Sequence, residues 1–366
     1  TPVIEQEVTV GDDRQKVAIQ VEKQDAENGA TVEGAVFGIY NKDDIKAEGK
    51  VIVNADTLLQ EMTSDKDGIA SCTLDLPLGQ YYVKELKAPA GFVSSDEVLN
   101  LDASYQGQDV KTVKLKTVKK NQPTTVEITK SDVTTGVELD GAKLTVLDRE
   151  GNVVDQWTSV KDQPHVIKRL TVGEEYTLRE EIAPYGYLKA TDVKFTLEDT
   201  AEIQKVEMKD ARPTGKLVLK KTDAEDGSPL AGAEFELRIK KSGKVVATLV
   251  TDEEGIATSG DIPIATYKDG KMKKEIEYIL VETKAPEGYV RSEKEENVVF
   301  EYKDDKTKEI EITKELTNER IPTGGYVKSP KTGDDTNIWL PILLLVLSVG
   351  GIAGIFWYTK KKNHEE

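Results

Sequence analysis

The sequence predicts an all-β protein with three tandem domains of similar size. A segment of twelve residues occurs three times, and in each copy a strand-like alternation leads into a Pro-x-Gly turn and an aromatic residue. The copies span residues 81–92, 176–187 and 278–289. The repeats that contain them have about 100 residues each, which is the usual size of a β-sandwich domain.

Each copy of the segment carries a glutamate on a strand face that is otherwise apolar. Side chains two positions apart point to the same face, so Glu282 shares a face with Tyr278 and Leu280. Glu85 and Glu180 occupy the same place in the other copies. Because an unpaired charge in a core is costly, three glutamates at one place in a repeat are not expected by chance.

A lysine breaks the same rule in the first strand of every repeat. Leu217, Leu219 and Lys221 share one face, and the other repeats show the same alternation. An aspartate follows two residues after each lysine, Gly-Ala follows eleven residues after it, and the last strand ends in an amide or an acid. In the first repeat, Thr117 and Lys119 interrupt the apolar face of that last strand. The lysines are Lys23, Lys130 and Lys221, the aspartates are Asp25, Asp132 and Asp223, and the terminal residues are Asn121, Asp210 and Asn318.

This ordered pattern resembles the collagen-adhesin B-type repeat, also called the SpaA-type or prealbumin-like domain, of Gram-positive surface proteins. The resemblance covers roughly residues 15–321. It implies tandem immunoglobulin-like β-sandwiches and an isopeptide bond in each, from the lysine Nζ to the terminal side chain, assisted by the glutamate. The implied bonds are Lys23–Asn121, Lys130–Asp210 and Lys221–Asn318, with Glu85, Glu180 and Glu282 as catalytic partners. Three buried Lys–Glu ion pairs without a covalent bond are the alternative.

The end of the chain differs in character from the repeats. Residues 329–333, Ser-Pro-Lys-Thr-Gly, resemble the sortase sorting signal Leu-Pro-x-Thr-Gly, with Ser329 in place of leucine. Residues 338–358 are mostly apolar and long enough, as a helix, to cross a hydrocarbon core of about 30 Å. Three lysines follow at 360–362, as expected for a cytoplasmic end. The order predicts sortase processing at Ser329, Pro330, Lys331, Thr332 and Gly333, and a plain single-pass anchor is the alternative.

These signals divide the chain into seven segments. Because it begins at Thr1 without an apolar leader, although its other end implies export, we expect a processed form or a fragment of a longer protein. The segments are 1–14, a linker or the end of an upstream domain; 15–122, 123–213 and 214–321, the three repeats; 322–337, a linker with the sorting motif; 338–358, the transmembrane helix; and 359–366, a basic cytoplasmic tail.

Composition excludes several classes of function. A net charge of −17 argues against nucleic acid as a partner, because phosphate binding needs a basic surface. One cysteine allows no intrachain disulfide, and lysine–asparagine bonds would provide the missing covalent cross-links of an exported β-protein.

We expect Cys72 to be a small buried apolar residue and His165 a surface residue. The acidic turns 223–227 and 252–255 lack the spaced donors of a calcium loop, and the sequence indicates no metal or other cofactor.

Two insertions distinguish the repeats from one another. The segment 41–63 of the first repeat is longer than its counterparts, and we expect a short helix at 54–62. The insertion 265–274 in the third repeat holds four lysines, and we expect a mobile hairpin there.

The sequence therefore predicts a cell-wall-anchored surface adhesin, or the stalk of one, on the extracellular surface. It shows no constellation for enzymatic turnover, so the lysine chemistry would be a single self-reaction. Expected partners are sortase, peptidoglycan, the membrane before sorting, and a host matrix protein or glycan as the adhesin's ligand. The alternatives are a pilin subunit, although no Tyr-Pro-Lys acceptor motif occurs, and the stalk of a wall-anchored enzyme whose catalytic domain lies upstream.

Overall fold

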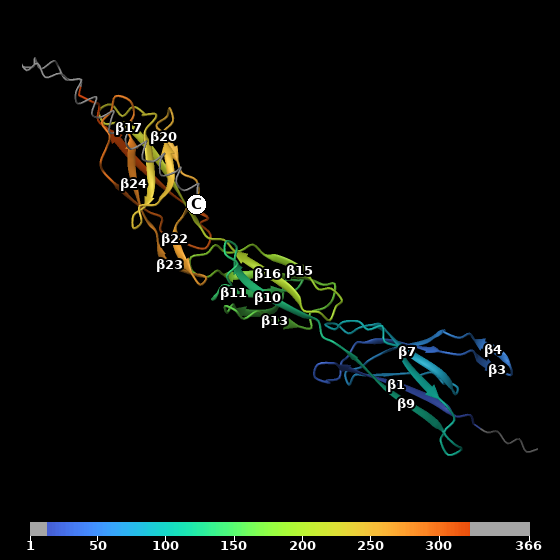
Figure 1. Ribbon diagram of the computed structural model, residues 1–366. Coiled ribbons are helices and arrows are strands. Elements are labelled where there is room, and N and C mark those ends of the chain that lie inside the picture. Colours follow the sequence, from blue (N-terminus) through green and yellow to red (C-terminus); the bar gives the residue numbers. More distant parts are fainter. Residues whose placement is uncertain (1–12, 323–366) are drawn as a thin grey trace, which may run out of the picture. The chain divides into compact units, whose positions relative to one another are not determined.

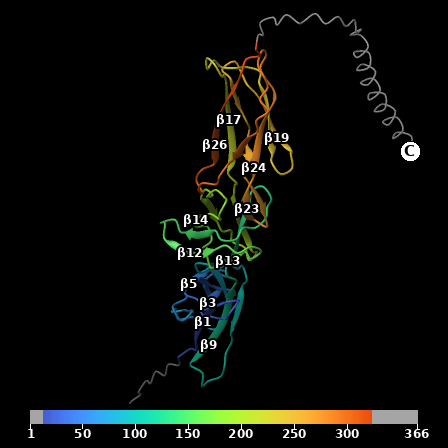
Figure 2. The same cartoon turned by 90° about the vertical axis from the view of Figure 1, so that its left-hand side faces the viewer.

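The computed structural model describes residues 13–322, and this part of the chain is built from β-strands without a helix. The all-β prediction is therefore confirmed for these residues. Each repeat contains two main sheets, and the first and last strands of the repeat are neighbours in one of them. Figure 1 shows this pairing for β1 and β9, and Figure 2 shows it for β17 and β26.

In the first repeat, one sheet has the order β6-β1-β9 and the other the order β5-β2-β7-β8. A small hairpin, β3-β4, is inserted after β2. The strands are β1 (Lys16–Asp25), β2 (Val36–Asn41), β3 (Ile45–Ala47), β4 (Lys50–Val53), β5 (Leu58–Thr63), β6 (Ile69–Ser71), β7 (Gly79–Lys87), β8 (Leu99–Ala103) and β9 (Thr112–Asn121).

The second repeat has the same plan, with sheets β13-β10-β16 and β12-β11-β14-β15. Its strands are β10 (Thr125–Asp132), β11 (Lys143–Leu147), β12 (Val153–Thr158), β13 (His165–Lys168), β14 (Glu175–Ile182), β15 (Val193–Thr196) and β16 (Gln204–Asp210).

The third repeat pairs β17 with β20, β21 and β26, and its second sheet has the order β19-β18-β24-β25. A hairpin, β22-β23, is its insertion. The strands are β17 (Thr214–Asp223), β18 (Glu234–Ile239), β19 (Val245–Val250), β20 (Ile256–Thr258), β21 (Ile262–Pro263), β22 (Ala265–Lys268), β23 (Lys271–Glu275), β24 (Glu277–Lys284), β25 (Glu296–Val299) and β26 (Glu309–Asn318).

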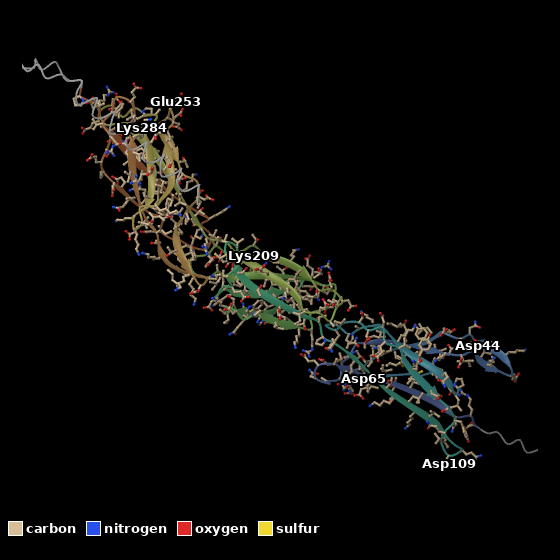
Figure 3. All side chains as sticks on the ribbon, in the orientation of Figure 1. Asp44, Asp65, Asp109, Lys209, Glu253 and Lys284 are labelled. Atoms are coloured by element: carbon tan, nitrogen blue, oxygen red, sulfur yellow. The ribbon has the colours of Figure 1, made fainter. Side chains whose placement is uncertain are left out.

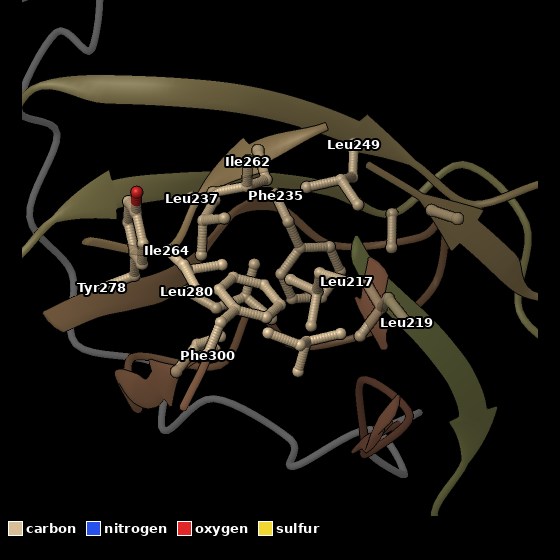
Figure 4. Close-up of a cluster of buried hydrophobic side chains, with 14 of the residues drawn as sticks. Leu217, Leu219, Phe235, Leu237, Leu249, Ile262, Ile264, Tyr278, Leu280 and Phe300 are labelled. Atoms are coloured by element: carbon tan, nitrogen blue, oxygen red, sulfur yellow. The ribbon is translucent and has the colours of Figure 1, made fainter. Parts of the chain in front are cut away.

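The core of each repeat draws apolar side chains from both sheets. In the third repeat, Leu217 and Leu219 of β17 belong to the same buried cluster as Phe235 and Leu237 of β18 (Figure 4). The other two repeats have equivalent clusters. Charged side chains such as Lys209 cover the outside of the sandwiches (Figure 3). Strand alternation thus separates core from surface, which makes the exceptions to it informative.

The helix expected at 54–62 is wrong. The second half of this segment forms β5, which pairs antiparallel with β2 and places Met62 opposite Phe37. Met62 is 3% exposed and belongs to the core of the first repeat. Cross-strand pairing and burial therefore decide this segment against its local helix propensity.

The hairpin expected at 265–274 is present as β22 and β23. It contacts the second repeat, because Lys271 Nζ lies 2.8 Å from a carboxylate oxygen of Asp140 and the Tyr267 hydroxyl donates to the Gly186 carbonyl at 2.5 Å. The sequence predicted the hairpin but not these contacts, because their partners, Asp140 and Gly186, belong to the second repeat.

Several predictions fall outside the described residues. These are most of the N-terminal linker, the sorting motif at 329–333, the apolar segment 338–358 and the basic tail. Among residues 13–322 no helix could cross a membrane. Within the same range, no group of three or more His, Cys, Asp and Glu side chains is arranged to hold a metal ion.

Candidate cross-linking sites

Parallel pairing of the first and last strands brings each predicted lysine to its predicted partner. In the first repeat, Asp25 lies opposite Asn121 across β1 and β9. Because Lys23 is two residues before Asp25, its side chain is on the same face as Asn121 and diagonally adjacent to it. The same register pairs Asp132 with Asp210 and Asp223 with Asn318.

The glutamate reaches this place from the opposite sheet. Glu282 is in β24 and pairs with Phe235 of β18, and Glu85 and Glu180 have the equivalent pairings with Phe37 and Leu144. In each case the ladder has a register shift beside the glutamate. Such bulges re-aim side chains and are common next to functional sites.

The Pro-x-Gly-aromatic end of the repeated segment is a tight turn. The N–H of the aromatic residue donates to the proline carbonyl three residues earlier, at 3.1 Å in all three repeats. The glycine has φ between +82° and +89°, where a side chain would be strained. The turn brings the chain back over the site, so the residues that follow it can contact the glutamate.

In the second repeat, the three predicted residues are in direct contact and almost fully buried. The Lys130 amine contacts an Asp210 carboxylate oxygen and lies 3.0 Å from Glu180 Oε1. Glu180 Oε2 accepts the Ala190 N–H at 2.7 Å. Burial raises the pKa of Asp210 to about 7, against the opposing effect of the Lys130 charge. Burial thus favours the neutral, protonated form of this acid.

The third repeat has the same arrangement with an amide in place of the acid. Lys221 Nζ lies 3.5 Å from Glu282 Oε1. Asn318 Nδ2 donates to Glu282 Oε2 at 3.0 Å and to the Val290 carbonyl. The Ser292 N–H also donates to Glu282 Oε2, at 2.5 Å. Burial lowers the pKa of Lys221, which favours the neutral amine.

In the first repeat the glutamate is less buried and contacts the asparagine, whereas Lys23 Nζ donates to the Gln24 carbonyl at 3.3 Å. Asn121 Nδ2 donates to Glu85 Oε2 at 2.6 Å and to the Val93 carbonyl at 2.7 Å. The Lys23 side chain is 0% exposed, with its Nζ 5.6 Å from the centre of the Phe92 ring. Burial lowers the pKa of Lys23 to about 8, although the Glu85 charge opposes this shift.

A second buried lysine explains the irregular face of β9. Lys119 lies opposite Lys23 in the ladder, at the position that Met208 and Leu316 occupy in the other repeats. Its side chain is 1% exposed and donates to Ser95 Oγ at 2.8 Å and to a Glu97 carboxylate oxygen at 2.9 Å. Its positive charge adds to the lowering of the Lys23 pKa.

All three sites hold buried oxygen atoms without a hydrogen-bond partner. An orphaned buried polar atom costs about 1–3 kcal/mol, so few persist without a reason. Glu180 Oε1 is one of them, since it lies close to the Lys130 amine but outside hydrogen-bonding geometry. Six of the seven such side-chain atoms among residues 13–322 belong to these sites: Glu85 Oε1, Asn121 Oδ1, Glu180 Oε1, Asp210 Oδ2, Glu282 Oε1 and Asn318 Oδ1.

Cys72, His165 and the acidic turn 252–255 have ordinary structural surroundings. Cys72 is half-buried against the core of the first repeat, where burial raises the pKa of its thiol. His165 is partly exposed and stacks on Trp157, with ring centres 4.0 Å apart. In the acidic turn 252–255, Asp252 accepts the N–H of Ile256 at 2.7 Å and so closes its own turn.

The aspartate that follows each lysine belongs to a further cluster that we had not predicted. Asp132 accepts hydrogen bonds from the Tyr187 hydroxyl at 2.9 Å and from Arg212 Nε at 2.8 Å. Tyr187 is the last residue of the repeated segment, and Arg212 comes two residues after Asp210. We call this trio of aspartate, tyrosine and arginine the acid clamp. The repeated Asp and Tyr were visible in the sequence, but their contact was not.

Tandem β-sandwiches with a buried lysine, a glutamate and a terminal Asn or Asp define a class of repeat protein. The sequence model of the SpaA prealbumin-like fold domain matches residues 17–119, 124–212 and 215–316. The chain belongs to this family. The resemblance inferred from the repeated motifs is therefore confirmed at the level of the domain family.

The chain is also similar to several solved structures. The chain is 28% identical to the Bacillus anthracis TIE protein, with a TM-score of 0.50, over 84% of this chain and 51% of that protein. The chain thus spans about half the length of TIE. It is also similar to BcpA, the major pilin subunit of Bacillus cereus (18% identity, TM-score 0.46, 84% of this chain and 100% of that one). It is similar as well to the major pilin SpaD from Corynebacterium diphtheriae (16% identity, TM-score 0.38, 87% of this chain and 100% of that one). No curated protein matches the chain.

Proposed function

We propose that the chain is a cell-wall-anchored surface protein whose repeats form a stalk, each stiffened by one Lys–Asn/Asp isopeptide bond. The observation that carries this proposal recurs in all three repeats. A buried lysine and a buried terminal Asn or Asp lie on one face of paired strands, and the glutamate contacts at least one of them. The glutamate and the Asn or Asp each have a buried oxygen atom without a hydrogen-bond partner. A set of ordinary ion pairs would not require the third residue. Membership of the SpaA prealbumin-like family supports the same chemistry.

In the first and third repeats the reaction is an exchange of amides. The neutral lysine Nζ attacks Cγ of Asn121 or Asn318, a carbon–nitrogen bond forms, and the original carboxamide nitrogen leaves as ammonia. Glu85 or Glu282 takes a proton from the attacking amine and gives one to the leaving nitrogen. Both glutamates already accept a hydrogen bond from that nitrogen, at 2.6 Å and 3.0 Å.

In the second repeat the reaction is a condensation. Lys130 Nζ attacks Cγ of protonated Asp210, the new amide forms, and water leaves. The pKa of about 7 at Asp210, raised by burial, supplies the neutral acid that this step needs. Glu180 lies 3.0 Å from Lys130 Nζ and has the proton-handling role of the other glutamates.

The fold accounts for the rate of such a reaction without an enzyme. In the first and third repeats burial lowers the pKa of the lysine and favours the neutral amine, and the parallel register places the amine diagonally next to its target. A well-oriented intramolecular reaction has an effective concentration of about 10⁵ M or more. Each site reacts once, so the chemistry is self-modification and not turnover.

The position of the bonds supports a mechanical role. The chain enters the first repeat along β1, reaches Lys23 near the strand's end, and leaves the repeat directly after Asn121. A Lys23–Asn121 bond would carry a pulling force straight across, and the residues between them would bear none of it. The Lys130–Asp210 and Lys221–Asn318 bonds would do the same, which suits a stalk.

Anchoring is proposed from the sequence alone. Sortase would cleave between Thr332 and Gly333 and join the Thr332 carbonyl to a peptidoglycan amine, after residues 338–358 have held the precursor in the membrane. An adhesive role would add a host matrix protein or glycan as partner. A pilin subunit and the stalk of a wall-anchored enzyme stay as alternatives.

The intact mass of the purified full chain, kept in detergent, tests the cross-links. We expect it to be lower than the sequence mass by two ammonias and one water. A deficit of one ammonia and one water would mean that only one of the two Lys–Asn repeats, the first or the third, has reacted, and a peptide map would identify it. An unmodified mass in a folded chain would contradict the proposed bonds and leave three ion pairs.

A further inference from the structure

Each repeat buries a second carboxylate at the end of its first strand. Asp25, Asp132 and Asp223 are 2%, 0% and 2% exposed. One oxygen of each accepts the N–H two residues later, at 2.7–2.8 Å, and so closes the turn that follows the strand. The other oxygen needs a donor, because a buried carboxylate without a positive partner is strongly destabilising.

The second and third repeats supply that donor from within themselves. Asp132 is held by Tyr187 and Arg212 in the acid clamp described above. Asp223 has the same clamp, with the Tyr289 hydroxyl at 2.7 Å and Arg320 Nε at 2.6 Å.

The first repeat lacks both of the clamp's donors. Phe92 stands at the tyrosine position and has no hydroxyl, and Pro123 stands at the arginine position and has no guanidinium. The two positions correspond in the structure as well as in the sequence, because Phe92 and Pro123 form an isolated β-bridge, as Tyr289 and Arg320 do. The sequence of this repeat therefore leaves Asp25 without a partner of its own.

Arg169 of the second repeat supplies the missing positive partner of Asp25. Its Nη2 donates to Asp25 Oδ2 at 2.6 Å, and its guanidinium carbon lies 6.0 Å from the centre of the Phe92 ring. Burial would raise the pKa of Asp25, but the hydrogen bonds from Arg169 and from the Glu27 N–H outweigh it and lower the pKa. Arg169 follows β13 directly, and Lys168 beside it pairs with Glu27.

The backbone around Arg169 is fitted to this contact. Arg169 has φ of +64°, a left-handed conformation that is uncommon for a residue with a side chain. Its N–H donates to the Thr124 carbonyl at 3.0 Å, and the Thr124 N–H donates to the Gly91 carbonyl at 3.0 Å. A β-carbon on Gly91 would lie 2.6 Å from the Arg169 carbonyl oxygen, so the two backbones are in close approach.

We propose that Arg169 is a positioning residue that completes the acid clamp of the first repeat from the second, and so joins the two repeats into one cooperative unit. The joined end of the first repeat is the end that carries Lys23 and Asn121. The second and third repeats close their clamps internally, so this coupling is particular to the first junction. It holds whether or not the isopeptide bonds form.

Hydrogen exchange measured by mass spectrometry on the full chain in detergent tests this proposal. We expect Arg169→Gln to speed exchange at least tenfold in the turn that Asp25 closes (residues 27–29) and at Thr124. Amides of the third repeat serve as an internal reference for folding. Arg149→Gln, at an exposed turn of the same repeat, is the matched control and should change neither site.

Two rescues separate a missing charge partner from general damage. Asp25→Asn removes the buried charge, so Arg169→Gln added to it should have little further effect on the turn. Phe92→Tyr with Pro123→Arg builds a clamp within the first repeat and should restore protection of residues 27–29 in the Arg169→Gln chain. The proposal is overturned if Arg169→Gln behaves like the Arg149 control, or if neither rescue reduces its effect.

Discussion

The amine of Lys221 lies 3.5 Å from Glu282 Oε1, and each of the two side chains is 1% exposed. As a simple ion pair this contact would add little stability, because the cost of removing both charges from water offsets their attraction. The amide of Asn318 also donates to the same glutamate. The proposed nucleophile and the proposed target therefore both contact the proposed proton carrier, which is the arrangement that a self-reaction requires.

Removal of the proton carrier should stop one bond and leave the others. We expect Glu282→Ala to reduce the mass deficit, measured against the variant's own sequence mass, by one ammonia, because Lys221 and Asn318 then remain separate. The fold should survive with a loss of about 1–3 kcal/mol for each donor left without its acceptor. Glu287→Ala, at an exposed position of the following turn, is the control and should leave the mass deficit complete. A full deficit in Glu282→Ala would remove the glutamate from the mechanism.

The buried amine of Lys23 should be visible as a pH dependence of stability. In Asn121→Ala the amine stays free. Burial lowers its folded-state pKa to about 8 from the ordinary value of 10.5, so the unfolded chain binds more protons between these values. The cost of burying the charged amine is fully present below about pH 8 and disappears as the pH rises toward 10.5. The free energy of unfolding of the first repeat should therefore rise by about 1–3 kcal/mol between pH 7 and pH 10. Denaturant unfolding at pH 7 and pH 10 measures the gain.

The control for that experiment is Lys23→Met in the same Asn121→Ala background. Methionine has no titrating group, so the difference between the two chains isolates Lys23 from the tyrosines and other lysines that also titrate in this range. Equal pH dependence in both chains would show that Lys23 is not a strongly desolvated amine.

The proposed bonds should make each repeat inextensible. Single-molecule pulling on the two ends should show no unfolding step from a bonded repeat, because force passes from lysine to Asn or Asp through a covalent bond. Without the bond, the 99 residues from Lys23 to Asn121 would add roughly 300 Å of extended chain. Borrowing the loop-entropy estimate for disulfides, each bond should also stabilise its repeat by roughly 4–5 kcal/mol.

The pulling experiment has an internal comparison. Glu282→Ala should release one unfolding step, from the third repeat, while the first two repeats stay closed. Three full unfolding steps from the unaltered chain would be incompatible with all three bonds.

Anchoring should depend on Thr332. In cells that express the chain, we expect a muramidase digest of the wall to release it and Thr332→Ala to shift it to the detergent-soluble membrane fraction. A chain that stays in the membrane fraction with or without Thr332→Ala would mean a plain membrane anchor. A ladder of covalent multimers in the digest would instead favour the pilin alternative.

Much of the fold and of the candidate site was accessible from the sequence, because both follow from local order. Alternation with period two fixes which side chains face a core, so a lysine or a glutamate in phase with leucine stands out without coordinates. Three copies of the pattern made Lys221, Glu282 and Asn318 recognisable as one set, although 97 residues separate the first from the last. Internal repetition supplied the comparison that a single domain would have lacked.

Tertiary structure alone decided what depends on neighbours distant along the chain. Residues 58–63 form a strand because they pair with the edge of β2 and because Met62 packs in the core of the first repeat. Lys119 is tolerated in the core because Ser95 and Glu97 reach its amine. Asp25 looked equivalent to Asp132 and Asp223 in the sequence, yet its partner comes from another repeat. The physical reason is the same in each case: periodicity tells which way a side chain points, whereas the energy of a buried polar group depends on what packs against it.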